Sequence, residues 1–221
     1  MAEWAVITGA GRGLGRELAL KFASSGYNLF LHARDVEFLK SVKAEVQKFS
    51  IEVDLCTGDL RDREIVTSLL SRALSKNPAV VINNAGVPCP GLPLNELKED
   101  YIESLFEVNL HTPIIMCKAF YEHFLKRKSG TIININSIVG IEAKKLRSVY
   151  SAVRFGLRGF TQALSMEAAE KGIRVFGVYP SRIKSKPEYE YGFETEDVAN
   201  RIFDYMQSQK GDELVLDGRP K

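Results

Sequence analysis

The chain has few of the residues that build disulfide frameworks and metal sites. Its three cysteines are Cys56, Cys89 and Cys117, and it has only three histidines among 221 residues. An odd number of scattered cysteines argues against a disulfide framework and indicates reduced thiols. No histidine has the spacing to a cysteine or carboxylate that is typical of metal ligands, so we expect no metal site.

Long apolar runs and an excess of one charge are also missing. No stretch approaches the roughly 20 apolar residues that cross a bilayer, and the first residues, with a carboxylate at Glu3, lack the charged-then-apolar order of a secretory signal. The formal net charge of +2 provides no electrostatic footprint for nucleic acid or an anionic membrane. We therefore expect a cytoplasmic protein that binds neither nucleic acid nor membranes.

What the chain does contain is typical of one globular domain. It is 45% hydrophobic and 26% charged, and its length is sufficient for one large buried core. We predict a single domain over residues 1–221 and no second independent domain.

The N-terminal segment combines a buried strand, a glycine-rich turn and a helix. Residues 4–15 read Trp-Ala-Val-Ile-Thr-Gly-Ala-Gly-Arg-Gly-Leu-Gly, and a helix is predicted over 16–24. Gly9, Gly13 and Gly15 permit positive φ angles and leave no Cβ in the way, so the backbone can approach a diphosphate. The helix directs free N–H groups and its positive dipole end at the same anion. Because the order is T-G-x-x-x-G-x-G instead of G-x-G-x-x-G, a tight turn without a ligand is the alternative interpretation.

Apolar strands and helical patterns alternate along the rest of the chain. After the first strand, further strands are predicted at 27–32, 51–56, 79–82, 130–135, 173–179 and 213–216. Helices are predicted at 36–49, 65–74, 99–128, 150–171 and 195–207. Right-handed crossovers return each such helix to the sheet. The sequence therefore predicts an α/β fold with a single doubly wound parallel sheet of about seven strands and helices on both faces.

Two local features refine this prediction. Pro113 is expected to kink or break the helix 99–128 near residues 109–112. Asp62 is expected to cap the helix that follows it. Ligands of parallel sheets bind at the carboxyl ends of the strands, which directs attention to the residues that follow each strand.

Six short motifs at these strand ends resemble those of the short-chain dehydrogenase/reductase family. They are Thr8-Gly9-x-x-x-Gly13-x-Gly15, Asp59-Leu60, Asn83-Asn84-Ala85-Gly86, Val108-Asn109-Leu110, Ile135-Asn136-Ser137 and Tyr150-x-x-x-Arg154. The resemblance covers the chain almost end to end. It implies a Rossmann fold that binds a nicotinamide dinucleotide along the strand ends.

The resemblance also implies which residues contact the cofactor. Asp59 and Leu60 are expected near the adenine, and the Asn-Asn-Ala-Gly turn near the ribose, although this turn could also simply cap its strand. The expected cofactor residues are Thr8, Gly9, Arg12, Gly13, Leu14, Gly15, Ala33, Arg34, Asp59, Leu60, Asn83, Ala85, Gly86, Tyr150, Arg154, Pro180, Ile183 and Ser185.

The end of the second strand favours NADP(H) over NAD(H). Family members that bind NAD have an acidic residue there, whereas this chain has Ala33 followed by Arg34. A small residue leaves room for the 2′-phosphate, and a guanidinium can bind it with two hydrogen bonds. Arg12 offers a second cation. Asp35 argues against this choice, because its carboxylate could reach a ribose. Arg34 could also form a surface ion pair with Asp35 or Glu37 instead of binding a phosphate.

The resemblance implies an oxidoreductase site in which Tyr150 is the acid, Ser137 holds the substrate oxygen and Asn109 positions a water for proton relay. The family has lysine where this chain has Arg154. An arginine carries the same charge, but its guanidinium is planar, longer and unable to give up a proton. We therefore expect an NADP(H)-dependent reductase of carbonyls or dehydrogenase of alcohols. The alternative is a non-catalytic NADP(H)-binding sensor or assembly protein.

The segment near 184–194 is short where the family has a substrate-covering insertion. Its aromatic residues, Tyr189, Tyr191 and Phe193, are expected either to wall the site in part or to cover the sheet edge. An open pocket excludes water poorly. The helices 99–128 and 150–171 have more apolar surface than one sheet face needs, so a homodimer or homotetramer is expected.

Overall fold

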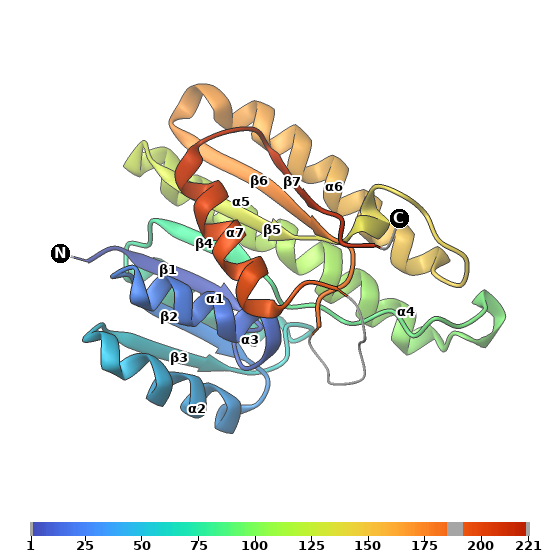
Figure 1. The fold of residues 1–221 in the computed structure, drawn as a ribbon, viewed down its shortest axis with the longest axis horizontal. Helices are drawn as coiled ribbons and strands as arrows, with labels where there is room; N and C mark the ends of the chain where they lie inside the picture. Colours follow the sequence, from blue (N-terminus) through green and yellow to red (C-terminus); the bar gives the residue numbers. More distant parts are fainter. Residues whose placement is uncertain (1, 185–191, 220–221) are drawn as a thin grey trace.

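A computed structural model describes residues 2–184 and 192–219 and places seven strands in one sheet. The strands are β1 (Trp4–Thr8), β2 (Asn28–Ala33), β3 (Val53–Thr57), β4 (Val80–Asn83), β5 (Gly130–Ile135), β6 (Ile173–Pro180) and β7 (Glu213–Leu216). Their order across the sheet is β3-β2-β1-β4-β5-β6-β7, and every neighbouring pair is parallel (Figure 1). The predicted doubly wound parallel sheet is confirmed.

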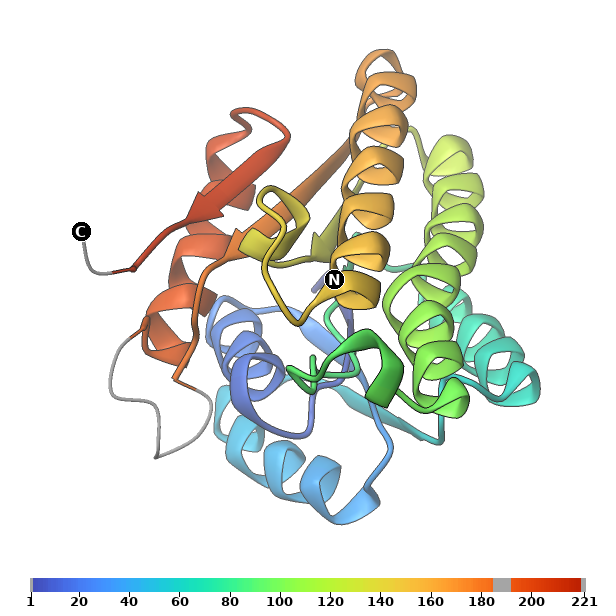
Figure 2. The ribbon, with the colours of Figure 1, turned by 90° about the vertical axis from the view of Figure 1, so that its right-hand side faces the viewer.

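Helices cover both faces of this sheet. They are α1 (Gly13–Ser24), α2 (Val36–Val46), α3 (Arg63–Ser75), α4 (Glu99–Phe106), α5 (Thr112–Arg127), α6 (Ser148–Ala168) and α7 (Thr195–Ser208). Helices α1, α2 and α7 pack on one face, and α3, α5 and α6 pack on the other (Figure 2). None of the helices in the described ranges is both long and apolar enough to cross a membrane.

Strand periodicity divides the core between the two faces. In β1 the side chains of Ala5 and Ile7 join the cluster under α1, α2 and α7, whereas Val6 between them joins the cluster under α3, α5 and α6. All three are fully buried. Side chains of a strand alternate between faces, so a strand with helices on both sides must be apolar throughout. Fully burying one such side chain stabilises the fold by about 1.5–3 kcal/mol.

The predicted break in the helix 99–128 is a π-helical turn. This turn, η3 (Glu107–His111), separates α4 from α5, and Pro113 lies in the first turn of α5. Proline is tolerated there because the first N–H groups of a helix have no carbonyl partner. The turn places Asn109 in the interior, where it is 1% exposed.

Aspartates cap two of the helices that follow strands. The Asp62 carboxylate accepts a hydrogen bond from Glu64 N–H (2.8 Å) at the start of α3, as predicted. The Asp35 carboxylate accepts one from Glu37 N–H (2.8 Å) at the start of α2. Such caps stabilise a helix by about 1 kcal/mol.

Candidate active site

The polar motifs meet at one edge because all strands of a parallel sheet end there. The glycine turn follows β1, the Asn-Asn-Ala-Gly turn follows β4, and Ser137 follows β5. Tyr150 lies in the first turn of α6, which packs against η3 and against the short helix η4 (Ile138–Gly140). The edge therefore collects residues that are far apart in the sequence.

The glycine turn adopts a conformation that requires glycine. Gly9 and Gly13 have φ angles of 66° and 54°. A Cβ on Gly15 would lie 2.1 Å from the carbonyl oxygen of Gly9, which is backbone and cannot move aside. The turn thus brings α1 directly against the end of β1, with no side chain between them.

Asn84 fixes this turn from the neighbouring strand. Its side-chain amide donates hydrogen bonds to the carbonyl oxygens of Thr8 (2.9 Å) and Gly9 (3.1 Å). In return, the Thr8 hydroxyl accepts hydrogen bonds from the backbone N–H groups of Asn84 (3.0 Å) and Ala85 (3.1 Å). The ends of β1 and β4 are therefore joined by a closed set of polar contacts.

The N-terminus of α1 differs from those of α2 and α3. No side chain of the described residues caps it, and the residue before its first turn, Arg12, is exposed. Leu14 is buried beneath the turn. The free N–H groups and the helix dipole make this end suitable for an anion.

The two residues after β2 have different roles: Asp35 caps a helix, and Arg34 is a cation without an ion pair among the described residues. Asp35 is committed to capping α2, and Glu37 forms an ion pair with Lys40. Arg34 is exposed and forms no ion pair with any residue that the structure describes. Ala33 is buried. Because this residue is alanine, the position where the family's NAD-binding members have an acidic residue carries no carboxylate.

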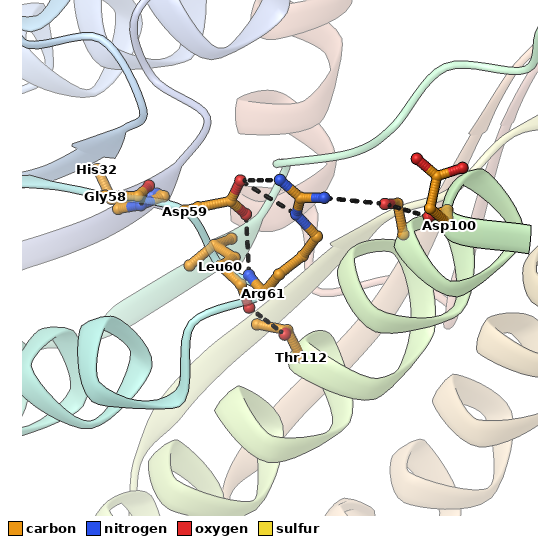
Figure 3. Close-up of polar contacts among 8 residues, drawn as sticks. His32, Gly58, Asp59, Leu60, Arg61, Asp100 and Thr112 are labelled. Atoms are coloured by element: carbon orange, nitrogen blue, oxygen red, sulfur yellow. Dashed lines mark hydrogen bonds and ion pairs between the residues drawn. The ribbon is translucent and has the colours of Figure 1, made fainter.

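The loop after β3 is held rigidly by polar contacts (Figure 3). Arg61 binds the Asp59 carboxylate through Nη2 (2.7 Å), Nε (3.1 Å) and its backbone N–H (2.9 Å). Its remaining nitrogen, Nη1, donates to the Ser104 hydroxyl on α4 (3.2 Å). Arg61 is the main cause of a lowered pKa for the Asp59 carboxyl. The Thr112 hydroxyl donates to the Leu60 carbonyl (3.0 Å) and closes the other side of the loop.

A buried histidine on β2 contacts the start of the same loop. His32 is 1% exposed, and its Nε2 lies 3.1 Å from the Gly58 carbonyl oxygen (Figure 3). Its Nδ1 has no partner among the described residues. Burial lowers the pKa of His32, an effect that the Gly58 carbonyl and the Asp59 charge only partly oppose.

The Asn83 side chain points into the protein. Its amide donates to Asn134 on β5 (2.8 Å) and contacts the Cys117 sulfur (3.3 Å). Burial raises the pKa of Cys117 to about 12, so this cysteine is a core thiol, as expected from its helical pattern. Asn83 also lines a narrow crevice between the strand ends and α5 that has no room for a water molecule. The crevice is lined by Thr8, Leu60, Asn83, Ala85, Val108, Thr112, Pro113 and Met116.

Arg154 is buried beside the ring of Tyr150. It is 7% exposed, its Nη1 donates to the Ile135 carbonyl (3.1 Å), and its guanidinium carbon lies 4.9 Å from the ring centre of Tyr150. Its Nε has no hydrogen-bond partner among the described residues. A Cβ on Gly86 would lie 3.2 Å from Nη2, so the guanidinium fits closely under this glycine. A cation over a ring face is attracted by the π electrons.

Ser137 and Asn109 are fixed by backbone contacts. The Ser137 hydroxyl accepts from Val139 N–H (3.3 Å) at the start of η4. The Asn109 amide binds both polar groups of Val87: its Oδ1 accepts from the N–H (2.7 Å) and its Nδ2 donates to the carbonyl (2.9 Å). A Cβ on Gly86 would also lie 3.1 Å from Asn109 Oδ1, which places this amide beside the Arg154 guanidinium.

The segment after β6 is described only at its two ends. Pro180 ends the strand, and Ile183 pairs with Phe193 in a short parallel bridge. Lys184 N–H donates to the Phe193 carbonyl (2.8 Å), which closes the base of the short connection. Ser185 and the two tyrosines of the expected lid lie outside the described residues.

Sequence reasoning missed several residues that position the others. Asn136 donates to the Arg154 carbonyl (3.0 Å) and accepts from Ser137 N–H (2.9 Å), so it links β5 to α6. Tyr101 on α4 donates to the Pro88 carbonyl (2.5 Å) and lies within electrostatic reach of Tyr150. The asparagines in the strand-end motifs were a visible signal, whereas nothing in the sequence distinguishes Tyr101 from a packing residue.

Comparison with known proteins identifies relatives of this chain. The family model described as short chain dehydrogenase matches residues 3–191. A 3-oxoacyl-[acyl-carrier-protein] reductase of Staphylococcus epidermidis is 30% identical over 222 residues, which cover 98% of this chain and 85% of the relative.

Two solved structures share the fold over nearly their whole length. A metagenomic short-chain oxidoreductase in complex with NADP has a TM-score of 0.87 at 29% identity, with 99% of this chain and 98% of that chain covered. An alcohol dehydrogenase from the archaeon Thermococcus sibiricus, complexed with 5-hydroxy-NADP, has a TM-score of 0.91 at 26% identity, with both chains fully covered. With the family model spanning most of the sequence, these matches show that the chain belongs to the short-chain dehydrogenase family.

Proposed function

We propose that the chain is an NADP(H)-dependent oxidoreductase that interconverts a carbonyl compound and a secondary alcohol. The observation that carries this proposal is the Arg154 guanidinium, which is buried and 4.9 Å from the Tyr150 ring centre at the edge where the strands end. A buried cation is costly unless nearby groups compensate it. One placed beside a tyrosine at such an edge is more readily explained by chemistry than by stability.

Three features of this chain fit a dinucleotide. Gly9 and Gly13 have positive φ angles and no Cβ, so a diphosphate can approach the backbone of the glycine turn closely. The N-terminus of α1 has no side-chain cap among the described residues, which suits a diphosphate. The buried Nε of Arg154 lacks a described partner and would be satisfied by a ribose hydroxyl.

The chain's own groups then have the following roles. The cofactor, when bound, supplies the hydride. The Tyr150 hydroxyl donates a proton to the substrate oxygen, and the Ser137 hydroxyl holds that oxygen by a hydrogen bond. Arg154 keeps a permanent positive charge beside the phenol, because a guanidinium does not lose its proton in proteins. Asn109 holds the backbone of Val87. It also positions a water molecule, through which Tyr150 regains the proton that it has donated.

Cofactor choice follows from the residues after β2. Arg34 is exposed and forms no ion pair with a described residue, and the neighbouring carboxylate, Asp35, is committed to a helix cap. A free guanidinium without a competing acid favours a 2′-phosphate. Two solved relatives are complexes with NADP or its 5-hydroxy derivative, which supports the same choice.

One observation favours the alternative, a dinucleotide-binding protein without turnover. Arg154 donates Nη1 to the Ile135 carbonyl and stacks on the tyrosine ring. A guanidinium does not give up its proton, so Arg154 cannot take part in a proton relay to Tyr150. Its fixed charge can still help to bind the dinucleotide.

Turnover separates the two functions. We expect NADPH consumption with at least one member of a panel of ketones, aldehydes and quinones, and a loss of about 10²–10⁴-fold in kcat in Tyr150→Phe. Tyr121→Phe removes a hydroxyl that binds the Glu167 carbonyl on an exposed surface and is the matched control. If neither the wild type nor Arg154→Lys reduces any carbonyl, the enzyme proposal fails. Activity that arises only in Arg154→Lys would favour the binding protein.

A further inference from the structure

A single arginine occupies most of the acceptor sites of the Asp59 carboxylate. It accepts three hydrogen bonds from Arg61, two of them from the guanidinium and one from the backbone N–H (Figure 3). The guanidinium is held from its other side by the Ser104 hydroxyl, which in turn donates to the Asp100 carbonyl (2.7 Å). Arg61 therefore spans the space between the loop after β3 and helix α4 in a defined orientation.

A second arginine competes for the same carboxylate. The ends of β2 and β3 lie side by side, with Gly58 N–H donating to the Ala33 carbonyl (3.2 Å), so Arg34 and Asp59 follow adjacent strand ends. The charge of Arg34 also contributes to lowering the pKa of the Asp59 carboxyl. Arg34 nevertheless forms no ion pair with Asp59 in the described structure. Because a carboxylate has room for only about four hydrogen bonds, the three from Arg61 leave little for another guanidinium.

Without Arg61 the local balance of charge would change in two ways. The Asp59 carboxylate would be uncompensated and would repel any nearby phosphate. It would also attract Arg34 and withdraw that cation from the end of β2. Both effects act most strongly on the extra phosphate that distinguishes NADPH from NADH, because only that phosphate would lie beside Arg34. Any effect of Asp59 on the adenine is common to the two dinucleotides and cancels in the ratio of their dissociation constants.

We propose that Arg61 is a specificity-determining residue: by occupying the Asp59 carboxylate, it keeps Arg34 free for the 2′-phosphate of NADPH. The inference rests on the proposed function, since it concerns how the same site selects its cofactor. Arg61 needs no contact with the dinucleotide to do this.

The pair is exposed enough to be removed without unfolding the protein. The Arg61 and Asp59 side chains are 54% and 32% exposed, and exposed ion pairs contribute little to stability. A matched control exists on the strand that precedes this loop. Arg72 binds Asp54 at 2.7 Å and is 44% exposed, but Asp54 lies within β3, away from the carboxyl edge.

The test is calorimetric titration of the purified chain with NADPH and, separately, with NADH. In Arg61→Met we expect the Kd for NADPH to rise roughly tenfold, the size of one uncompensated charge in a partly exposed site, and the Kd for NADH to change less than twofold. Arg72→Met should leave both constants unchanged. Adding Asp59→Asn to Arg61→Met should return the ratio of the two constants close to that of the wild type, because the repelling charge is gone.

The outcomes distinguish this inference from the proposal on which it rests. If Arg61→Met weakens both dinucleotides equally, or neither, Arg61 only shapes the loop and the inference is wrong, although the cofactor site stands. If the double substitution fails to restore the ratio, Asp59 is not the intermediary and the inference is equally wrong. A wild-type chain that binds neither dinucleotide would overturn the proposed function itself.

Discussion

His32 is a buried titratable side chain that contacts the loop after β3. It is 1% exposed, its Nε2 lies 3.1 Å from the Gly58 carbonyl, and its pKa is lowered by burial. The neutral imidazole fits this buried position. Its Nε2 can donate a hydrogen bond to the Gly58 carbonyl, and its uncharged Nδ1 needs no counter-ion. Protonation would put a charge into the core beneath the loop that carries Asp59.

This gives a pH dependence with a definite sign. The unfolded chain takes up the His32 proton as the pH falls through about 6.5, whereas the folded chain resists it until a lower pH. The free energy of unfolding should therefore fall between about pH 7 and pH 5 by more in the wild type than in His32→Gln, which cannot titrate. Urea unfolding at several pH values measures the difference. Equal slopes in the two proteins would show that His32 contributes nothing.

At the scale of elements, the turn between β1 and α1 sets the geometry of the edge. Its conformation depends on backbone contacts alone: Gly9 has a positive φ, and the place of a Gly15 Cβ is taken by the Gly9 carbonyl. The Asn84 amide binds the Thr8 and Gly9 carbonyls and ties the turn to β4. A change in the turn should therefore affect binding even without a change in any charged group.

Gly15→Ala tests this. The added methyl would lie 2.1 Å from a backbone oxygen, so the turn must shift, and we expect a loss of about 1–3 kcal/mol in unfolding free energy together with weaker NADPH binding. Gly159→Ala in α6 is the control, because nothing lies within 4 Å of its Cβ position. That substitution should stabilise the helix by roughly 0.5–1 kcal/mol. Unchanged stability and binding in Gly15→Ala would contradict the role of the turn.

The elements were predictable because their signals are local, and the contacts between them were not. Periodicity and Pro113 predicted the sheet, its helices and the break before α5, although not that this break is a π-helical turn. The motifs placed Ser137, Tyr150 and Arg154 at one edge. Their pairings depend on tertiary approach: no pattern in the sequence indicates that Asn83 turns inward to Asn134, or that Arg61 binds Asp59 instead of leaving it to Arg34.

For the molecule as a whole, four of the ten large apolar residues that are exposed in the described ranges lie on helices α4, α5 and α6. They are Phe106 on α4, Leu125 on α5, and Phe155 and Met166 on α6, between 39% and 75% exposed. Apolar surface of this kind is typical of an interface between copies. We propose that the chain forms a homodimer or homotetramer through these helices.

Sedimentation velocity checks this proposal. The wild type should sediment as a dimer or tetramer, and Phe155→Glu combined with Met166→Glu should shift it toward the monomer, because two carboxylates would be buried in the contact. Val36→Glu, at a residue that is 42% exposed and begins α2 on the opposite face of the sheet, should have no effect. A wild type that sediments as a monomer at all concentrations would refute the proposal.

The proposed activity is hydride transfer between NADP(H) and a carbonyl carbon at this edge of the sheet. The most direct measurement uses NADPH deuterated at the transferable position and mass spectrometry of the alcohol products from a carbonyl panel. We expect one deuterium in a product formed by the wild type, and at least about 100-fold less labelled product from Tyr150→Phe under the same conditions. NADPH that binds at the glycine turn while no product carries the label would contradict the account and leave a binding protein.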